Sequence, residues 1–286
     1  MKKRIVSVVL ACCMLCFGAL ALSACGGGSS SSSSSATSDN APVDNVFIVG
    51  FDQSYPPYGY KDTETGEFTG LDLDLAEEVC KRNGWTFQAE PIDWDAKDAL
   101  INQGNITCIW NGFTYEGREN DYSFTDMYMI NGQVVVVKAD SGINSLADLA
   151  GKTVMTQVDS AALEVLDGDE KSLQDTFAGG KVETIGDYNN AFMQLESGMV
   201  DAVACDLSIA QYQMAAKPGI FRMLPEQLSS EHYAVAFKKG NDGLADQVTA
   251  TLKEMDADGT VKEICEKYSA DGISYENWCF SPLKPE

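Results

Sequence analysis

Apolar stretches of strand length alternate along this chain with stretches in which apolar residues recur at helical spacing, from residue 46 to the end. The first strand is expected at 46–50, and the apolar positions of 71–79 follow at helical spacing until Gly84 ends the helix. Further strands are expected at 85–89, 107–110, 133–137, 153–156, 181–185, 200–205 and 233–237, and further helices at 160–166, 187–197, 242–256 and 261–268. This regular alternation predicts the α/β class.

The pattern also divides the chain into two lobes. The run 133–137 is apolar enough to be buried on both faces, and we expect it to leave the first lobe. Ser145 and Asp148 then have the spacing of a capping box, which opens a short helix and a new α/β unit. Because 233–237 has the pattern of a returning strand, the C-terminal part is expected to rejoin the first lobe. The expected bounds are 44–136 with 233–286 for lobe 1 and 137–232 for lobe 2.

The first 25 residues have the features of an export signal. Three basic residues at 2–4 precede an apolar run over 5–22, and the sequence Leu-Ser-Ala-Cys stands at 22–25. The run is barely long enough for a transmembrane helix, whereas the small residues before Cys25 suit a signal peptidase and resemble the bacterial lipobox. We therefore expect a signal peptide over 1–24, lipidation of Cys25, and a flexible Gly/Ser-rich tether over 25–43.

The acidic composition excludes several classes of function. With 43 acidic and 20 basic side chains the net charge is −23, so DNA or RNA would meet a surface of like charge. His232 is the one histidine of the sequence, which excludes a multi-histidine metal centre and leaves a Ser-His-Asp mechanism a single candidate base. We expect no nucleic-acid partner, no metal and no other cofactor.

Five cysteines follow Cys25, an odd number that cannot pair completely within the chain. Disulfides persist outside the cytoplasm, so Cys265 and Cys279 are a candidate disulfide that would join the tail to the last helix. Cys80 on a predicted helix and Cys108 on a predicted strand are interpreted as small buried apolar residues. These five cysteines contain no CxxC pair that would indicate a redox or zinc site.

Six short motifs follow one another in an order typical of one protein family. They are GFDQSYPPY at 50–58, GLDLDLA at 70–76, WNGFT at 110–114 followed by Arg118, FTDMY at 124–128, LADLAGK at 146–152 and VDAVACD at 200–206. Over about residues 46–268 the chain resembles the extracellular solute-binding proteins of the polar amino-acid family, which serve ABC importers. The resemblance implies a two-lobed periplasmic-binding-protein fold of type II. Each lobe is then a mixed, mostly parallel sheet flanked by helices, and a two-strand hinge joins the lobes.

The resemblance also implies where an amino acid binds. A zwitterion taken out of water needs a fixed opposite partner for each charge. Arg118 matches the arginine that holds the ligand carboxylate, a role suited to its planar fork; a surface arginine is the alternative. Asp206 matches the acid that takes the ligand ammonium, and it follows the apolar strand 200–205, at the end where α/β sheets bind ligands. A helix N-cap is the alternative for Asp206.

Further site residues are implied by single matches to the family motifs. Asn111, Gly112 and Thr114 match a polar stretch whose backbone groups and hydroxyl meet the amino and carboxylate groups of the ligand. Ser160 matches a residue whose hydroxyl, with N–H groups at a helix start, reaches the ligand carboxylate. Asp159 departs from the family pattern, and because its carboxylate would repel that of the ligand, we expect it to face solvent or to cap the helix.

Four more residues are assigned to the ligand side chain or its surroundings. Asp52 and Tyr55 match positions that meet the ligand side chain, Asp52 by accepting hydrogen bonds or a positive charge and Tyr55 by stacking. The alternative is that Tyr55 packs on its own lobe. Trp110 lines the cleft or belongs to a core. Glu116 departs from the family, since related sequences have a small hydroxyl residue there.

Three functions follow from these residues. The first is a lipid-anchored, monomeric protein on the outer face of the bacterial cytoplasmic membrane, which binds a polar amino acid with high affinity between closing lobes and delivers it to an ABC importer permease. The second is an enzyme like the periplasmic cyclohexadienyl or arogenate dehydratases, with Glu116 and Asp52 as the candidate acids. The third is a ligand sensor that acts through a partner. We expect the first function and no enzyme, and the sequence leaves the choice among amino acids open.

Overall fold

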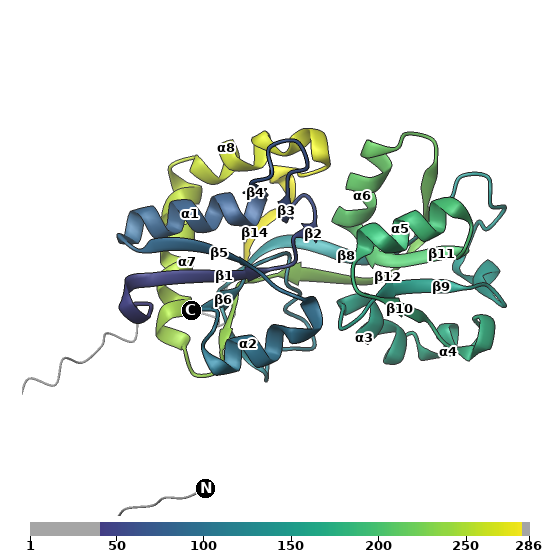
Figure 1. Ribbon diagram of the computed structural model, residues 1–286, viewed down its shortest axis with the longest axis horizontal. Helices are drawn as coiled ribbons and strands as arrows, with labels where there is room; N and C mark the ends of the chain where they lie inside the picture. Colours follow the sequence, from purple (N-terminus) through teal and green to yellow (C-terminus); the bar gives the residue numbers. More distant parts are fainter. Residues whose placement is uncertain (1–40, 282–286) are drawn as a thin grey trace, which may run out of the picture. The chain divides into compact units, whose positions relative to one another are not determined.

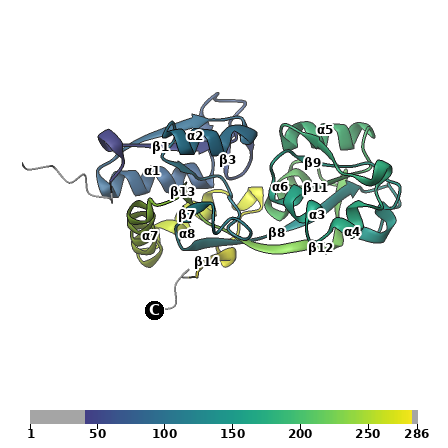
Figure 2. The same ribbon diagram turned by 90° about the horizontal axis from the view of Figure 1, so that it is seen from below.

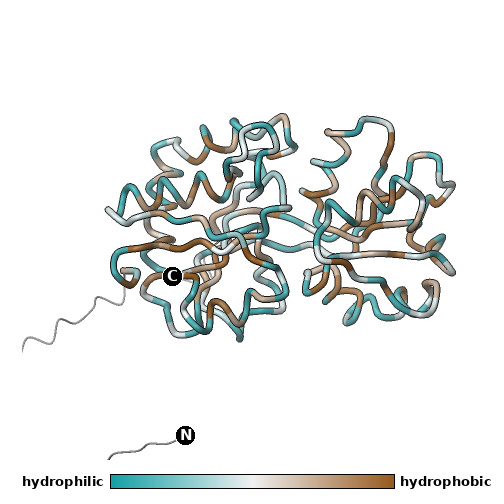
Figure 3. The backbone as a smooth tube through the Cα atoms, viewed as in Figure 1, coloured by the Kyte–Doolittle hydropathy of each residue, from teal (hydrophilic) through white to brown (hydrophobic). Residues whose placement is uncertain are grey.

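A computed structural model describes residues 41–281 of the 286-residue chain. The predicted signal peptide, the lipidation site at Cys25 and the tether up to residue 40 lie outside the described residues. Strands and helices alternate across 41–281, and Figure 3 shows that hydrophobic residues are concentrated along the strands. Within this range, no helix combines the length and the apolar character needed to cross a lipid bilayer.

The first lobe is built on a five-stranded sheet. Its strands are β1 (Val46–Phe51), β5 (Thr86–Pro91), β6 (Cys108–Ile109), β7 (Tyr122–Phe124) and β13 (Ala236–Lys238). The order is β5-β1-β6-β13-β7, with parallel pairing from β5 to β6 and antiparallel pairing on both sides of β13. Successive residues of β1 face opposite sides of the sheet, so that Phe47 and Val49 enter one hydrophobic cluster and Ile48 another.

Four helices cover this sheet. They are α1 (Leu71–Asn83), α2 (Lys97–Gln103), α7 (Asp242–Ala257) and α8 (Thr260–Lys267). Helix α1 ends as the sequence predicts, because Gly84 adopts a left-handed conformation with φ of 69° and its N–H closes the last turn. Figure 1 shows α1, α7 and α8 on one side of the sheet and α2 on the other. A small sheet beside α1 comprises β2 (Ser54–Tyr55), β3 (Gly59–Lys61) and β4 (Phe68–Thr69).

The second lobe is built on a sheet whose strands are β8 (Met127–Lys138), β9 (Val154–Gln157), β10 (Glu183–Ile185), β11 (Ala202–Asp206) and β12 (Phe221–Tyr233). A sixth strand, β14 (Trp278–Ser281), pairs with residues 127–129 of β8, beside the first lobe (Figure 1). The order is β10-β9-β11-β8-β12, with β14 also pairing to β8. Helices α3 (Ala161–Asp167) and α4 (Lys171–Gln174) cover one face, and α5 (Tyr188–Ser197) and α6 (Leu207–Ala216) the other (Figure 1). The short helix Leu146–Leu149 starts with the predicted capping box of Ser145 and Asp148.

Strands β8 and β12 form the connection between the lobes. They pair antiparallel from Tyr233 opposite Met129 to Phe221 opposite Lys138, and they run side by side from one lobe to the other (Figure 2). Residues 133–137 of β8 also pair with β11, in the sheet of the second lobe. We expected the boundary between the lobes after residue 136, whereas the strand pairing places residues 133–136 in the sheet of the second lobe. The chain returns at Tyr233 and enters the first sheet through β13.

The candidate disulfide between Cys265 and Cys279 is not formed, and both residues are free thiols. Cys265 is buried on α8 within the core of the first lobe, whereas Cys279 lies on β14, a strand that pairs antiparallel with β8. Burial raises the pKa of the Cys265 thiol to about 12. Because α8 directs Cys265 into the apolar core, its sulfur does not meet Cys279 on β14. Cys265 therefore packs as a small hydrophobic residue.

Candidate functional site

The predicted ligand residues stand where strands of both lobes end. Asp52 follows β1, residues 110–114 follow β6, and Asp206 is the last residue of β11. Parallel strands bring their carboxyl ends to one edge of a sheet, so each lobe presents polar groups at that edge. A cavity between the two edges is lined by Tyr55, Trp94, Gly112, Thr114, Arg118, Gln157, Ser160, Ala161, Tyr188 and Asp206. The structure thus brings the predicted carboxylate partner, Arg118, and the predicted ammonium partner, Asp206, to one cavity.

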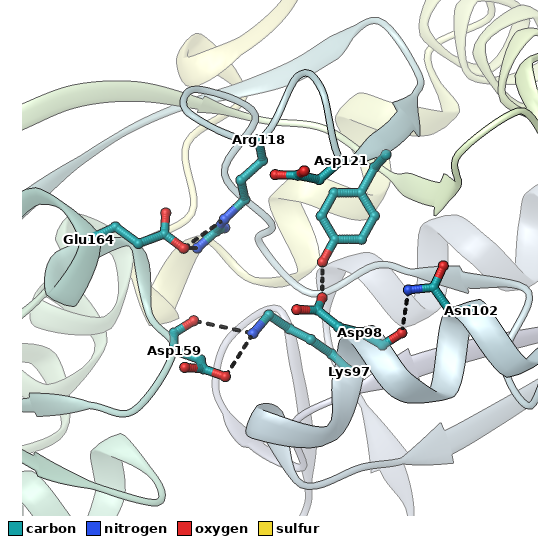
Figure 4. A pocket seen from close by; sticks show the side chains of 8 residues that line it. Lys97, Asp98, Asn102, Arg118, Asp121, Asp159 and Glu164 are labelled. Atoms are coloured by element: carbon teal, nitrogen blue, oxygen red, sulfur yellow. Dashed lines mark hydrogen bonds and ion pairs between the residues drawn. The ribbon is translucent and has the colours of Figure 1, made fainter.

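Arg118 extends from the first lobe toward the second. It is 6% exposed, and its guanidinium carbon lies 4.5 Å from the centroid of the Phe113 ring. Its Nη1 donates to the Thr114 carbonyl oxygen over 3.4 Å, while Nε and Nη2 donate to Oε1 of Glu164 over 3.2 and 2.9 Å. Figure 4 shows the Arg118 and Glu164 side chains pointing toward one another. The guanidinium is therefore held by stacking on Phe113 and directed at the carboxylate of Glu164.

A second ion pair joins the lobes beside the first. Nζ of Lys97 lies 3.6 Å from Oδ2 of Asp159, and it donates to the carbonyl oxygen of the same residue over 3.4 Å (Figure 4). Nε1 of Trp94 donates to that carbonyl oxygen as well, over 3.2 Å. Asp159 has a left-handed φ of 52°, and its half-exposed carboxylate faces Lys97. The helix is capped by Ser160, whose Oγ accepts from the N–H of Leu163 over 3.2 Å.

Asp206 supplies a buried carboxylate from the second lobe. It occupies the N-cap position of α6, yet its side chain makes no capping hydrogen bond. Its Oδ1 accepts from Asn131, Gln133 and the Tyr233 hydroxyl over 3.1, 2.8 and 2.9 Å. Burial raises the pKa of Asp206. The carboxylate is consequently held in place by donors, with no lysine or arginine in an ion pair with it among residues 41–281.

Asp52 does not itself line the cavity, but it links the lobes beside it through Gln157, which does. Its Oδ1 accepts from the N–H of Ser54 over 2.8 Å, and its Oδ2 accepts from Nε2 of Gln157 over 2.7 Å. Burial, the strongest influence, raises the pKa of Asp52 to about 6, and the charges of Asp187 and Asp93 contribute in the same direction. Three carboxylates thus act on this end of the site, which favours a group that donates hydrogen bonds or carries positive charge.

Aromatic residues surround the space between Asp52 and Asp206. The Tyr55 hydroxyl lies 3.2 Å from that of Tyr233, and the Tyr55 ring lies 6.1 Å from the ring of Tyr188 in the second lobe. Tyr55 therefore contacts residues of both lobes and lines the cavity. Trp110, in contrast, is fully buried in the core of the first lobe, 6.5 Å from the Tyr128 ring, and does not line the cavity.

A buried aspartate of the first lobe positions the loop that carries Gly112. Oδ2 of Asp72, at the start of α1, accepts from the N–H of Gly112 over 2.6 Å, and the Tyr128 hydroxyl donates to both oxygens of Asp72 over 2.9 and 2.8 Å. Gly112 has φ of 57°, and a Cβ there would lie 3.0 Å from atoms of two tyrosine rings. Asn111 accepts from the N–H of Asp52 over 3.0 Å and fixes the neighbouring loop.

Glu116, in the loop after β6, contacts the hinge strand β12. Its Oε2 accepts from the backbone N–H of His232 over 2.8 Å, and its Oε1 lies 2.7 Å from Nδ1 of the same histidine. Glu116 does not line the cavity that holds Arg118 and Asp206. The described part of the chain has no group of three or more His, Cys, Asp or Glu side chains arranged to hold a metal ion.

Sequence reasoning did not find four polar or aromatic residues of the site. Gln157 and Tyr188 line the cavity, Tyr233 donates to Asp206, and Glu231 is buried behind it, only 2% exposed. A signal for Gln157 was present, because it is a polar residue that ends a buried strand as Asp206 does. Glu231 stands in a polar stretch of β12, and only the pairing of that strand with β8 shows that it is buried.

Comparison with known proteins agrees with this geometry. The sequence model of the family "Bacterial extracellular solute-binding proteins, family 3" matches residues 47–271 of the chain. The L-cystine-binding protein TcyA of Bacillus subtilis (strain 168) is 30% identical over 270 residues, which cover 89% of this chain and 94% of that protein.

Two solved structures share the fold. A substrate-binding protein of an ABC uptake transporter from Streptococcus pneumoniae with bound histidine has a TM-score of 0.77 and 28% identity, with coverage of 82% of this chain and 96% of that one. An ancestral arginine-binding protein bound to arginine has a TM-score of 0.70 and 35% identity, with coverage of 78% and 98%. The fold is that of the type II periplasmic amino-acid-binding proteins. From its matched residues and its two lobes, the chain belongs to the bacterial extracellular solute-binding proteins, family 3.

Proposed function

We propose that this protein binds the zwitterion of a polar amino acid in the cavity between its lobes and delivers it to the permease of an ABC importer. The observation that carries the proposal is the placement of Arg118 and Asp206, which have opposite charges, on one cavity. The ligand carboxylate binds the Arg118 fork and the Ser160 hydroxyl, and the ligand ammonium binds Asp206, Thr114 and the carbonyl of Gly112. This arrangement satisfies both charges of an amino acid without water.

The other end of the cavity selects the side chain of the ligand. Gln157 supplies polar atoms there, with the charge of Asp52 directly behind it, and the rings of Tyr55 and Tyr188 supply apolar surface. The similar proteins include one named as cystine-binding, one solved with bound histidine and one named as arginine-binding. Because the acidic groups around Asp52 favour donors and positive charge, we propose a ligand with a nitrogen-bearing side chain or a second amino group.

The rest of the assignment follows from the family and the N-terminal sequence. We propose that the chain is exported, that Cys25 is lipidated after removal of residues 1–24, and that the tether holds a monomeric binding protein at the outer face of the bacterial cytoplasmic membrane. We further propose that it acts without catalysis, since the polar groups of the cavity are accounted for by binding and orientation of a zwitterion.

Thermal unfolding of the purified domain, residues 41–286, tests the ligand assignment. A ligand that binds only the folded state raises the unfolding midpoint. We expect a clear rise with one or a few of the proteinogenic amino acids, ornithine or cystine, and none with their decarboxylated or deaminated analogues. The analogues are the matched controls, because each lacks one of the two charges. Equal shifts with an amino acid and its amine analogue would contradict the assignment of Arg118.

Replacement of Asp52 by asparagine is expected to change which ligand is preferred. With a pKa of about 6, Asp52 is ionised at pH 7.5, so the change removes a charge at the side-chain end of the cavity. A hydrogen bond to a charged group contributes about 1.5–3 kcal/mol, so we expect affinity for arginine relative to glutamine to fall roughly tenfold to a hundredfold. Competition titrations at pH 7.5 measure the ratio. The control is Asp246→Asn on the exposed surface of α7, and an unchanged ratio in Asp52→Asn would refute the role of Asp52.

A further inference from the structure

The hinge strands bring a second buried carboxylate, Glu231, next to Asp206. Nδ2 of Asn131 donates to Oδ1 of Asp206 over 3.1 Å and to Oε1 of Glu231 over 2.6 Å. Nε2 of Gln133 donates to the same two oxygen atoms, over 2.8 Å each. An amide –NH2 group has two hydrogen atoms and can serve two acceptors at once. Two amides on β8 therefore bridge the carboxylates of β11 and β12.

The charge of this pair is not balanced by a cation. Asp206 is 4% exposed and Glu231 2%, and no lysine or arginine of the described chain forms an ion pair with either. Arg118, the cation that shares the ligand cavity with Asp206, is taken up by Glu164 and the Thr114 carbonyl. Two carboxylates so close together, away from water, do not both ionise, and one of them holds a proton.

Apart from Arg118, which is paired with Glu164, the groups named around the pair are acidic or neutral. Tyr233 and Tyr55 lie beside Asp206, and neither provides a positive charge. A second cavity is lined by Glu231 and also by three further acids, which are Glu116, Glu164 and Asp169. His232, the next residue along β12, pairs with Glu116. The surroundings therefore favour retention of the proton.

An unsatisfied atom points to the same conclusion from a different direction. Oε1 of Gln133 is buried and has no hydrogen-bond partner among the described residues. A buried carbonyl oxygen without a donor is unfavourable. This oxygen belongs to the amide that bridges Asp206 and Glu231, so the cluster has acceptors in excess and lacks a donor. A proton held by the carboxyl pair adds a donor to the cluster.

We propose that Asp206 and Glu231 act as one acid pair, which holds a proton in the ligand-free protein and releases it to solvent when the ammonium group of the ligand binds. The proposal rests on the proposed function, because it needs a ligand with an ammonium group at Asp206. The exchange is balanced in charge, since one cation arrives as one proton leaves. It makes Glu231 a part of the ammonium site, although Asp206 alone lines the ligand cavity.

Thr114 transmits the state of Glu231 to the ligand. Its hydroxyl donates to Oε1 of Glu231 over 3.0 Å. A hydroxyl has a single proton, so while Thr114 donates to Glu231 its oxygen can only accept from a ligand. Thr114 then receives a hydrogen bond from the ammonium group and has nothing to give to a carboxylate. Glu231 thereby orients the amino end of the ligand toward Thr114 and Asp206.

The pH dependence follows from the direction of the pKa shift. Burial, and after it the charge of Asp206, raises the pKa of Glu231 to about 8. An ammonium group nearby stabilises the ionised form and lowers that pKa. Below pH 8 a ligand must therefore displace the proton, and above pH 8 it need not. Affinity rises with pH between 6 and 8, by at most tenfold per unit for one proton.

Isothermal titration calorimetry in two buffers of different ionisation enthalpy measures the protons released. The probe is L-arginine, L-glutamine or L-cystine, whichever raises the unfolding midpoint most. For the wild-type protein at pH 7 we expect release of a large fraction of one proton, and affinity that rises about tenfold or more from pH 6 to 8. For Glu231→Gln we expect release close to zero and less than about twofold change in affinity over the same range. Glu226→Gln, an exposed residue of the same strand, is the control and should behave like the wild type.

The outcomes separate this inference from the proposed function. Equal proton release by the wild type and Glu231→Gln would overturn the acid pair and leave amino-acid binding intact. Absence of binding by the wild type to every probe would refute the proposed function instead. If Glu231→Gln does not fold, infrared difference spectra of wild-type protein labelled with 13C at glutamate carboxyl groups decide. Loss of an isotope-shifted protonated carboxyl band on ligand addition supports the pair, and its absence refutes it.

Discussion

Replacement of Arg118 by alanine is expected to weaken amino-acid binding by about 2–5 kcal/mol, roughly thirtyfold to several thousandfold. The guanidinium is buried and held against the Phe113 ring, so its loss leaves the ligand carboxylate in the cavity without an opposite charge. Its present partner, Glu164, has a half-exposed side chain and regains water when Arg118 is removed. We therefore expect affinity to fall much more than stability. Calorimetric titration gives the affinity, and thermal unfolding without ligand gives the stability.

The control for this experiment is Arg82→Ala on α1. Arg82 pairs with Glu78 and Asp258 on the surface of the first lobe, so its removal takes away the same charge from a site that has no contact with the cavity. We expect unchanged affinity in Arg82→Ala. Wild-type affinity in Arg118→Ala would show that the ligand carboxylate binds elsewhere.

Replacement of Asp72 by alanine is expected to lower the free energy of unfolding by about 2–6 kcal/mol, because two buried donors lose their acceptor at about 1–3 kcal/mol each. The donors are the N–H of Gly112 and the hydroxyl of Tyr128. Since Gly112 belongs to the binding loop, ligand affinity should fall as well. Urea unfolding measures the first effect and titration the second. The control is Glu77→Ala on the exposed face of the same helix, where loss of a surface carboxylate changes stability by about 0.5 kcal/mol at most.

Asp72→Asn separates the hydrogen bonds from the charge. Burial raises the pKa of Asp72 to about 7, compared with about 3.9 in an unfolded chain. Between these values the folded protein binds a proton that the unfolded chain has released, so the contribution of Asp72 to stability falls as pH rises from 4 to 7. We expect Asp72→Asn to gain stability relative to the wild type over that range. An identical pH dependence in both proteins would contradict the buried acid.

Much of the fold could be predicted from periodicity. The expected strand at 46–50 is β1, and the expected helix after it ends at Gly84 as the sequence indicates. Helix α5 starts beside Asp187, whose side chain caps it. The pattern did not indicate that β12 begins at Phe221, because this strand includes Pro225 and a run of polar residues, with irregular pairing there. A strand that pairs with β8 alone on one side needs no alternating pattern to be stable.

Prediction of the site was more uneven. Family motifs pointed to Arg118 and Asp206, and the structure places both on one cavity. The motifs could not separate residues that line the cavity from residues that support it. Trp110 and Asn111 were expected to line the cavity, but they are buried behind the loop that does. Glu231 was missed because its burial depends on side chains of β8 and β11, which lie far from it in the sequence.

The groups that hold the Asp206 carboxylate lie on the hinge strands, and this position affects the order in which a ligand is recognised. Opening of the lobes about β8 and β12 moves an atom in proportion to its distance from those strands. Asn131, Gln133 and Tyr233 lie on the strands themselves, whereas the contact of Asp52 with Gln157 joins residues outside them. The carboxylate of Asp206 thus keeps its donors in an open and a closed molecule, while the side chain of a ligand meets the groups of both lobes only on closure. We therefore expect different amino acids to be captured at similar rates and to differ mainly in how long each one stays bound.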